Sequence, residues 1–414
     1  MKPAAMPIDP GSRRFIYPLL AIVTITPLLM WFYWPAGHGL DVTGHQIGRD
    51  FINVWSGPQL AFGGRLSTLF DLKGYHAAIG ELFGTPLPFH NWGYPLFTLP
   101  AFWPLAQLPY FWALAIWTVG LFAFFARVTL GEVERDKRTY ALIALMLAPA
   151  CLINAVGGQM GFLSAALFLG GILAIDRRPI LAGVLFGLLT FKPQLGLLLP
   201  FVLLTLRAWR VIVAAAVTAI VLVAVTIPVF GIEAWRHYLD VAGGHQVLLL
   251  ERFSGFYTTM MASVFAGART FGLSYTAAMT IQIAVAVPVI AASCWAVRRT
   301  TDPCRRAFVL ACAAPLITPY TFNYDLTALS AGLVWILAGR LPWRAEFGPV
   351  YLLAWIAPTA MMFFNIFGLG IMPFALVALF GVSVFEATDV RQTANAHPAA
   401  GSAMPTAGLS PAQT

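Results

Sequence analysis

The sequence predicts an all-α polytopic membrane protein, and three observations support that fold class. Hydrophobic residues make up 59% of the 414 residues, and the mean hydropathy is +0.78. Soluble domains average about 45–50% apolar residues, so the excess here must face lipid. Charged residues amount to only 10% and separate apolar runs that are long enough for membrane helices. We therefore expect about 10–13 transmembrane helices of roughly 20 residues, some of them shorter.

The first apolar run, 16–34, is interpreted as a retained membrane span. No small-residue cleavage site follows it, and the aromatic residues 31–34 form the belt expected at a membrane interface. Arg13 and Arg14 precede this run, and basic residues favour the inner face. The segment 35–93 is therefore predicted to lie outside.

The remaining elements follow from apolar runs and the short polar turns between them. The stretch 94–110 is apolar but interrupted by prolines, so it is expected to dip into the membrane or lie at its interface. The run 111–129 then crosses inward. Further spans are predicted at 139–154, 160–175, 179–191, 194–207, 211–229, 275–297, 305–319, 326–339, 347–366 and 369–386.

This topology gives one integral membrane domain, 1–386, with two outer loops at 35–93 and 230–274 that carry interfacial helices. The tail 387–414 is rich in Ala, Pro, Thr and Ser and is expected to be disordered and cytoplasmic. No internal repeat is evident, which argues mildly against a transporter built from inverted repeats.

The net charge of +8 does not indicate a nucleic-acid partner, because most Lys and Arg residues fall in loops on the predicted inner face. The four cysteines show no metal-binding spacing and are interpreted as packing residues. We expect no metal ion and no cofactor.

The loop 35–93 gathers ionisable residues at the membrane rim, where such groups are functional candidates. Asp50 follows Arg49 and precedes an apolar aromatic segment. Burial would raise the pKa of this carboxyl group and Arg49 would lower it. Such a carboxylate is suited to act as a general base toward an alcohol. The alternative is that Asp50 only caps the helix that follows.

Two further outer segments are candidates. Asn91, Trp92 and Tyr94 precede the proline-rich stretch and form either the wall of a site for a lipid-linked ligand or a plain interfacial turn. Gln159 lies among the glycines of segment 157–161, which either expose backbone donors to a ligand or make a simple hairpin turn.

Lys192 lies between two apolar runs, where an unpaired charge would cost about 2.5–3.5 kcal/mol. It either meets an anion such as a phosphate at the outer rim or extends to water. Tyr324 and Asp325 end another outer hairpin. Asp325 is expected to pair with Arg49, Lys192 or Arg252, to contact a sugar hydroxyl, or to cap the next helix.

Four segments resemble glycosyltransferase family 87, whose members are polytopic polyprenyl-phosphate-sugar-dependent transferases with a GT-C-type fold. They are GRDFINVWSGPQLAFGG (48–64), NWGYPLFTLPAFWPLAQLPY (91–110), NAVGGQMGFLSAALFLGGILAIDRRPILAGVLFGLLTFKPQLGLLLP (154–200) and TPYTFNYDLTALS (318–330). Members often have Tyr-Pro-Pro at 94–96, Gly-Gln-Asn at 158–160 and Trp and His near 322–325. This chain has Tyr-Pro-Leu, Gly-Gln-Met and Phe-Asn-Tyr-Asp at those places.

The resemblance implies that Asp50 is the catalytic base of an inverting transfer. The expected donor is a hexose, mannose for example, on polyprenyl phosphate, and the expected acceptor is lipid- or glycan-linked. Lys192 would meet the phosphate, with Arg49 or Arg252 as second partners. The enzyme would lie among the lipids of a bacterial-type inner membrane, with its site facing the periplasm or exterior. The alternative class is a transporter or flippase for a lipid-linked or small polar solute.

Overall fold

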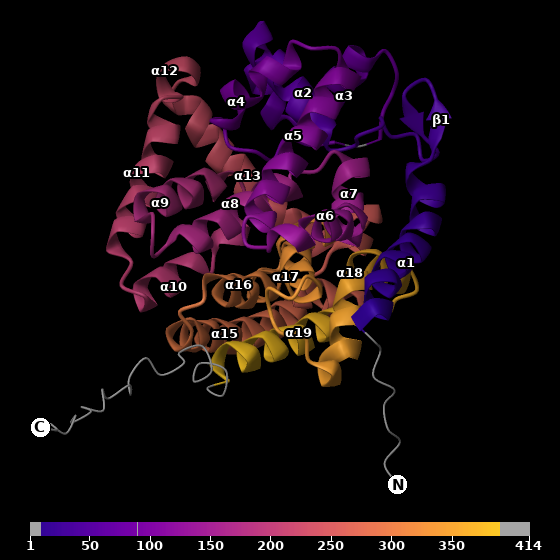
Figure 1. The fold of residues 1–414 in the computed structure, drawn as a ribbon. Coiled ribbons are helices and arrows are strands. Elements are labelled where there is room, and N and C mark those ends of the chain that lie inside the picture. Colours follow the sequence, from indigo (N-terminus) through magenta and orange to yellow (C-terminus); the bar gives the residue numbers. More distant parts are fainter. Residues whose placement is uncertain (1–9, 89, 390–414) are drawn as a thin grey trace, which may run out of the picture.

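The computed structural model describes residues 10–88 and 90–389, which fold almost entirely into helices (Figure 1). The predicted all-α class is confirmed. Two short strands, β1 (Pro35–Gly37) and β2 (Leu40–Asp41), pair antiparallel in the loop 35–93, which was predicted to lie outside. The α-helices are α1 (Pro10–Leu28), α2 (Phe51–Leu60), α3 (Leu72–Phe83), α4 (Thr98–Ala106), α5 (Tyr110–Leu130), α6 (Arg138–Leu147), α7 (Pro149–Gly157), α8 (Gly161–Ala174), α9 (Pro179–Leu188), α10 (Leu199–Thr205), α11 (Trp209–Ala224), α12 (Ile227–Phe230), α13 (Ile232–Arg252), α14 (Val264–Thr270), α15 (Tyr275–Arg299), α16 (Pro303–Ile317), α17 (Thr327–Leu337), α18 (Gly348–Ile366) and α19 (Met372–Thr388). The 3₁₀ and π turns are η1 (Leu29–Tyr33), η2 (Ala61–Arg65), η3 (Leu66–Phe70), η4 (Arg135–Lys137), η5 (Leu189–Phe191), η6 (Pro193–Gly196), η7 (Phe256–Met260), η8 (Asn323–Leu326) and η9 (Ala345–Phe347).

Fewer helices than predicted are long enough to cross a membrane on their own. In the described part of the chain, five are long and apolar enough, or six if the bent pair α6 and α7 forms one broken span. Further apolar helices are shorter, at 10–17 residues, so five or six helices meet this length where 10–13 spans, some of them short, were expected. Prolines divide several apolar runs, because proline lacks a backbone N–H and clashes with the preceding turn. Pro149 stands at the 58° bend between α6 and α7, and Pro193 is the first residue of η6, with Lys192 between it and the end of η5.

The shorter helices form the centre of the bundle. Helix α8 has no exposed residue and packs against α5, α9, α16 and α17, and α16 and α17 are likewise without exposed residues. Figure 1 shows α8, α16 and α17 between the outer helices. Short helices are tolerated at membrane depth when neighbouring protein, and not lipid, surrounds their ends.

The peripheral helices α1, α5, α11 and α15 turn large apolar side chains outward. Such a surface is typical of contact with lipid and rare on soluble proteins. Exposed examples are Leu19, Trp112, Val119, Val213, Ile220 and Val287. The protein is therefore a multi-pass membrane protein.

The two predicted outer loops contact each other. Helices α2, α3 and α4 gather at the upper end of Figure 1, where α2 packs against α4 and α5. Helix α13, in the second loop, packs against η3. Trp235 of α13 stacks on Phe97, with 6.3 Å between ring centroids. Helix α19 ends at Thr388, and residues 390–414 of the predicted tail lie outside the described residues.

Candidate functional site

Asp50 occupies the position before α2, and its carboxylate does not cap that helix. The capping interpretation is therefore wrong. Instead, the side-chain amide of Gln159 donates a hydrogen bond to one carboxylate oxygen of Asp50. The backbone N–H of Asp50 donates to Gly157 O at 3.3 Å. The base candidate is thus attached through both backbone and side chain to the glycine turn 157–161.

Arg49 faces away from Asp50 although the two residues are adjacent. Its guanidinium pairs with Asp41 at 2.8 Å, donates to Thr43 Oγ1 at 3.0 Å and lies 4.2 Å from the Tyr33 ring centroid. The backbone of Arg49 is left-handed, with φ 34°, a conformation that few non-glycine residues adopt. Asp50 forms no ion pair with any described residue, so its charge is not neutralised there by a cation.

The glycine turn approaches the first outer loop more closely than a side chain would allow. Gly158 has φ +57°, and a Cβ atom there would lie 2.4 Å from Gly48 O and 2.7 Å from the Phe51 Cβ atom. Trp117 Nε1 donates to Gly158 O at 3.2 Å. The turn therefore does more than join α7 and α8, because it fixes the position of Asp50.

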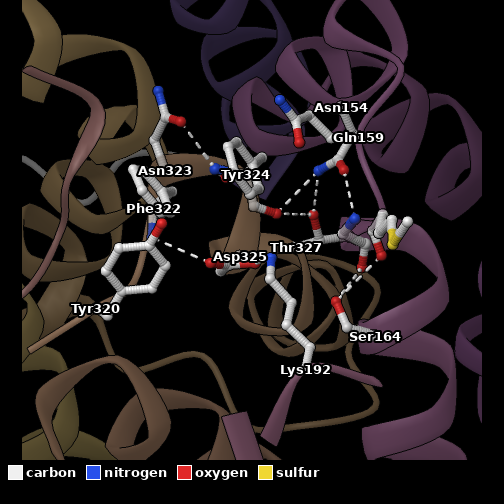
Figure 2. A network of polar contacts seen from close by, with 12 residues as sticks. Asn154, Gln159, Ser164, Lys192, Tyr320, Phe322, Asn323, Tyr324, Asp325 and Thr327 are labelled. Carbon is white, nitrogen blue, oxygen red and sulfur yellow. Dashed lines mark hydrogen bonds and ion pairs between the residues drawn. The ribbon is translucent and has the colours of Figure 1, made fainter. Parts of the chain in front are cut away.

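Asn154 connects this turn to the late outer hairpin (Figure 2). Its Nδ2 donates to Tyr324 O at 2.9 Å and to Thr327 Oγ1 at 2.6 Å, and its Oδ1 accepts from the Gly161 N–H at 2.8 Å. Asn154 was not among the candidates predicted from the sequence. An amide in an apolar run is visible there, but its burial and its distant partners are not.

Lys192 and Asp325 form a buried ion pair, as Figure 2 shows. Their side chains are 11% and 1% exposed, so the interpretation of Lys192 as a lysine extending to water is wrong. Asp325 also accepts from the Phe322 N–H at 3.0 Å and therefore caps η8 as well. The Lys192 ammonium lies 4.7 Å from the Tyr324 ring centroid. Of the three predicted partners of Asp325, the structure selects Lys192.

Three tyrosines connect the two acidic centres. Burial raises the pKa of the Tyr94 and Tyr324 phenols well above the usual value, and the charges of both Asp50 and Asp325 add to that effect. Burial also raises the pKa of the Tyr320 phenol, and the charges of Asp50 and Asp325 add to that effect. Both carboxylates thus act on the same three phenols, and Asn154 links the glycine turn that holds Asp50 to the Tyr324 carbonyl beside Asp325.

The segment before Tyr94 forms another wall. Trp92 is 4% exposed, packs against Gly57 and meets the Tyr94 ring edge-on at 5.4 Å, and Asn91 is half-buried beside it. His90, one of the histidines of the loop 35–93, is also buried, with 6% of its surface exposed. Burial lowers the pKa of His90, and the Asp50 charge opposes that shift.

Arg252 is exposed at the end of α13 and makes none of these contacts. Within residues 10–88 and 90–389, no group of three or more His, Cys, Asp or Glu side chains is placed to hold a metal ion. The site thus consists of an acid without an ion pair, a lysine–aspartate pair and aromatic walls.

A helical membrane bundle that holds ionisable groups from four distant segments in one neighbourhood has the parts of a membrane-embedded enzyme. The model of glycosyltransferase family 87 matches residues 92–319, more than half of the chain. The chain therefore belongs to this family of GT-C membrane glycosyltransferases, and the predicted relationship is confirmed. Gln159 and Lys192 lie within the matched segment, whereas Asp50 precedes it and Asp325 follows it. No curated protein and no solved structure gave a significant match.

Proposed function

We propose that this glycosyltransferase moves a hexose, mannose in the simplest case, from polyprenyl phosphate to a lipid- or glycan-linked acceptor. The reaction takes place at the outer face of a bacterial-type inner membrane. One observation carries the proposal: Asp50 has no ion pair among the described residues, whereas Asp325 in the same neighbourhood is neutralised by Lys192. A carboxylate that is not held in an ion pair is free to accept a hydrogen bond from a substrate hydroxyl and to take its proton.

Asp50 has one oxygen held by Gln159, and its other oxygen is without a hydrogen bond from the described residues. In the proposed reaction that second oxygen takes the proton from the acceptor hydroxyl. The hydroxyl oxygen attacks the anomeric carbon, and the bond from that carbon to the phosphate oxygen breaks. The electron pair leaves with the polyprenyl phosphate.

Lys192 is the cation best placed to meet the departing phosphate. An ammonium group has three donors, and Asp325 uses one of them. Asp325 therefore holds Lys192 at the site while leaving donors for the phosphate. Arg49, which Asp41 already neutralises, is less suited to this role, and the exposed Arg252 lies outside the cluster.

Inversion at the anomeric carbon is supported by the state of the other acids. A retaining mechanism requires a second carboxylate as nucleophile. Asp325 is bound to Lys192 and to the Phe322 N–H, and Asp41 is bound to Arg49. Neither has the freedom that a nucleophile needs, which favours a single displacement.

The test is reconstitution of the full chain in proteoliposomes with polyprenyl-phosphate mannose and a lipid extract as acceptor source. We expect a glycosylated product whose anomeric configuration, measured by NMR, is opposite to that of the donor. Retention of configuration would reject the single displacement. Flux of the donor lipid across the bilayer without product would favour a flippase and reject the proposal.

A further inference from the structure

A cavity of about 510 Å³ opens between α3 and the turn that follows it. Its volume falls within the range of small-molecule sites, about 300–1,000 Å³. Its lining includes Lys73, His76, Gly80, Glu81, Thr85 and Leu87. None of these residues belongs to the polar cluster around Asp50.

The two walls of the cavity are held together by His76. Its Nε2 lies 2.6 Å from Leu87 O, so the imidazole bridges α3 and the segment after it. The buried Leu87 side chain supplies an apolar floor. The cavity is thus formed by folded elements on both sides.

The charges around the cavity cancel. Lys73 makes no ion pair with any described residue, and one oxygen of Glu81 pairs with Arg65 at 2.8 Å. Asp71 accepts from the backbone N–H of Lys73. The lining thus carries one cation, Lys73, and one carboxylate, Glu81, which favours a neutral ligand with many hydroxyl groups over an anion.

The cavity is connected to the proposed base through His90. The segment that forms one wall, 84–87, continues toward His90 and Tyr94, with residue 89 outside the described residues. Burial is the largest cause of the lowered pKa of His90; the charge of Asp50 raises this pKa and the charge of His76 lowers it. His90 therefore lies within electrostatic reach of both the cavity wall and Asp50.

From this arrangement we infer that the cavity is a saccharide subsite, which binds a neutral sugar unit of the acceptor from the aqueous side. Its role toward the acceptor rests on the proposed function. Lys73 and Glu81 contribute a donor and an acceptor for sugar hydroxyls, and Leu87 contacts the apolar face of the ring. Since Lys73 and Glu81 line the cavity, it fits a glycan portion of the acceptor and leaves the polyprenyl chain to the membrane helices.

The test compares Gly80→Leu with Gly63→Leu in the full-length protein. A Cβ atom at Gly80 would lie 3.5 Å from Thr85 O, an ordinary contact, so the leucine side chain extends into the cavity. Gly63 lies in the same loop with nothing within 4 Å of its Cβ position and does not line the cavity. The probes are methyl α-mannoside, methyl β-glucoside and mannose 6-phosphate, measured by saturation-transfer NMR.

We expect the wild type and Gly63→Leu to bind a neutral glycoside and Gly80→Leu to lose at least ten-fold in affinity. Equal binding by both variants, no glycoside binding by the wild type, or preference for mannose 6-phosphate would overturn the inference. A wild type that binds glycoside but transfers no sugar in proteoliposomes would reject the proposed function and leave the saccharide subsite standing.

Discussion

Removing the charge of Asp325 should expose how strongly the buried ion pair supports the fold. In Asp325→Asn the shape and the acceptor for the Phe322 N–H remain, but Lys192 is left without its counter-ion. Breaking a buried pair from one side costs about 3–5 kcal/mol. Because 11% of the Lys192 side chain stays exposed, we expect the lower end, about 3 kcal/mol.

The assay is reversible unfolding in mixed micelles titrated with SDS, with the free energy of unfolding measured for each variant. Lys192→Met combined with Asp325→Asn should regain most of the loss, since the stranded charge is gone. Glu233→Gln is the control, because its pair with Arg236 is exposed and should contribute less than about 1 kcal/mol. If Asp325→Asn were no more destabilising than this control, the burial argument would fail.

Three further changes probe the supports of the site. Gln159→Met removes a hydrogen bond to the Asp50 carboxylate, worth about 1.5–3 kcal/mol. We therefore expect kcat to fall roughly 10- to 100-fold with little change in KM. A rise in KM alone would contradict the positioning role of Gln159. Burial and the neighbouring charge of Arg49 lower the pKa of His45 from 6.5 to about 4. The unfolded state therefore binds a proton at a higher pH than the folded state does, and the free energy of unfolding should decrease as pH falls through that interval. Unfolding free energies of His45→Gln should lack this slope, and an unchanged slope would refute the assignment. Gly158→Ala places a methyl group 2.4 Å from Gly48 O, at a residue whose φ is positive. We expect less folded protein, as measured by size-exclusion chromatography. Normal yield and elution would show that the close contact is not required.

Much of the fold follows from the apolar pattern, as individual helices show. The run predicted at 275–297 is helix Tyr275–Arg299, and the hairpin predicted at 179–191 and 194–207 appears with its break at Lys192. Hydropathy reports how apolar a run is, but not whether lipid or protein surrounds it. Helix α8, buried on all sides and only 14 residues long, was therefore predicted as an ordinary span.

The site was less accessible to sequence reasoning. Asp50, Gln159, Lys192 and Asp325 stood out because polar groups are conspicuous in an apolar chain. The direction in which Arg49 points depends on its left-handed backbone and on Asp41, and neither is visible in residue spacing. Asn154 was missed because its role depends on contacts with Tyr324 and Thr327, which are far away in the sequence.

The most direct test of the account is the single-turnover rate of sugar transfer by Asp50→Asn, with Asp240→Asn as an exposed control in α13. A general base contributes about 10²- to 10⁴-fold. The account predicts a loss of that size for Asp50→Asn at unchanged donor binding, and a normal rate for Asp240→Asn. A rate within a few-fold of wild type for Asp50→Asn would contradict the assignment of Asp50 as the base.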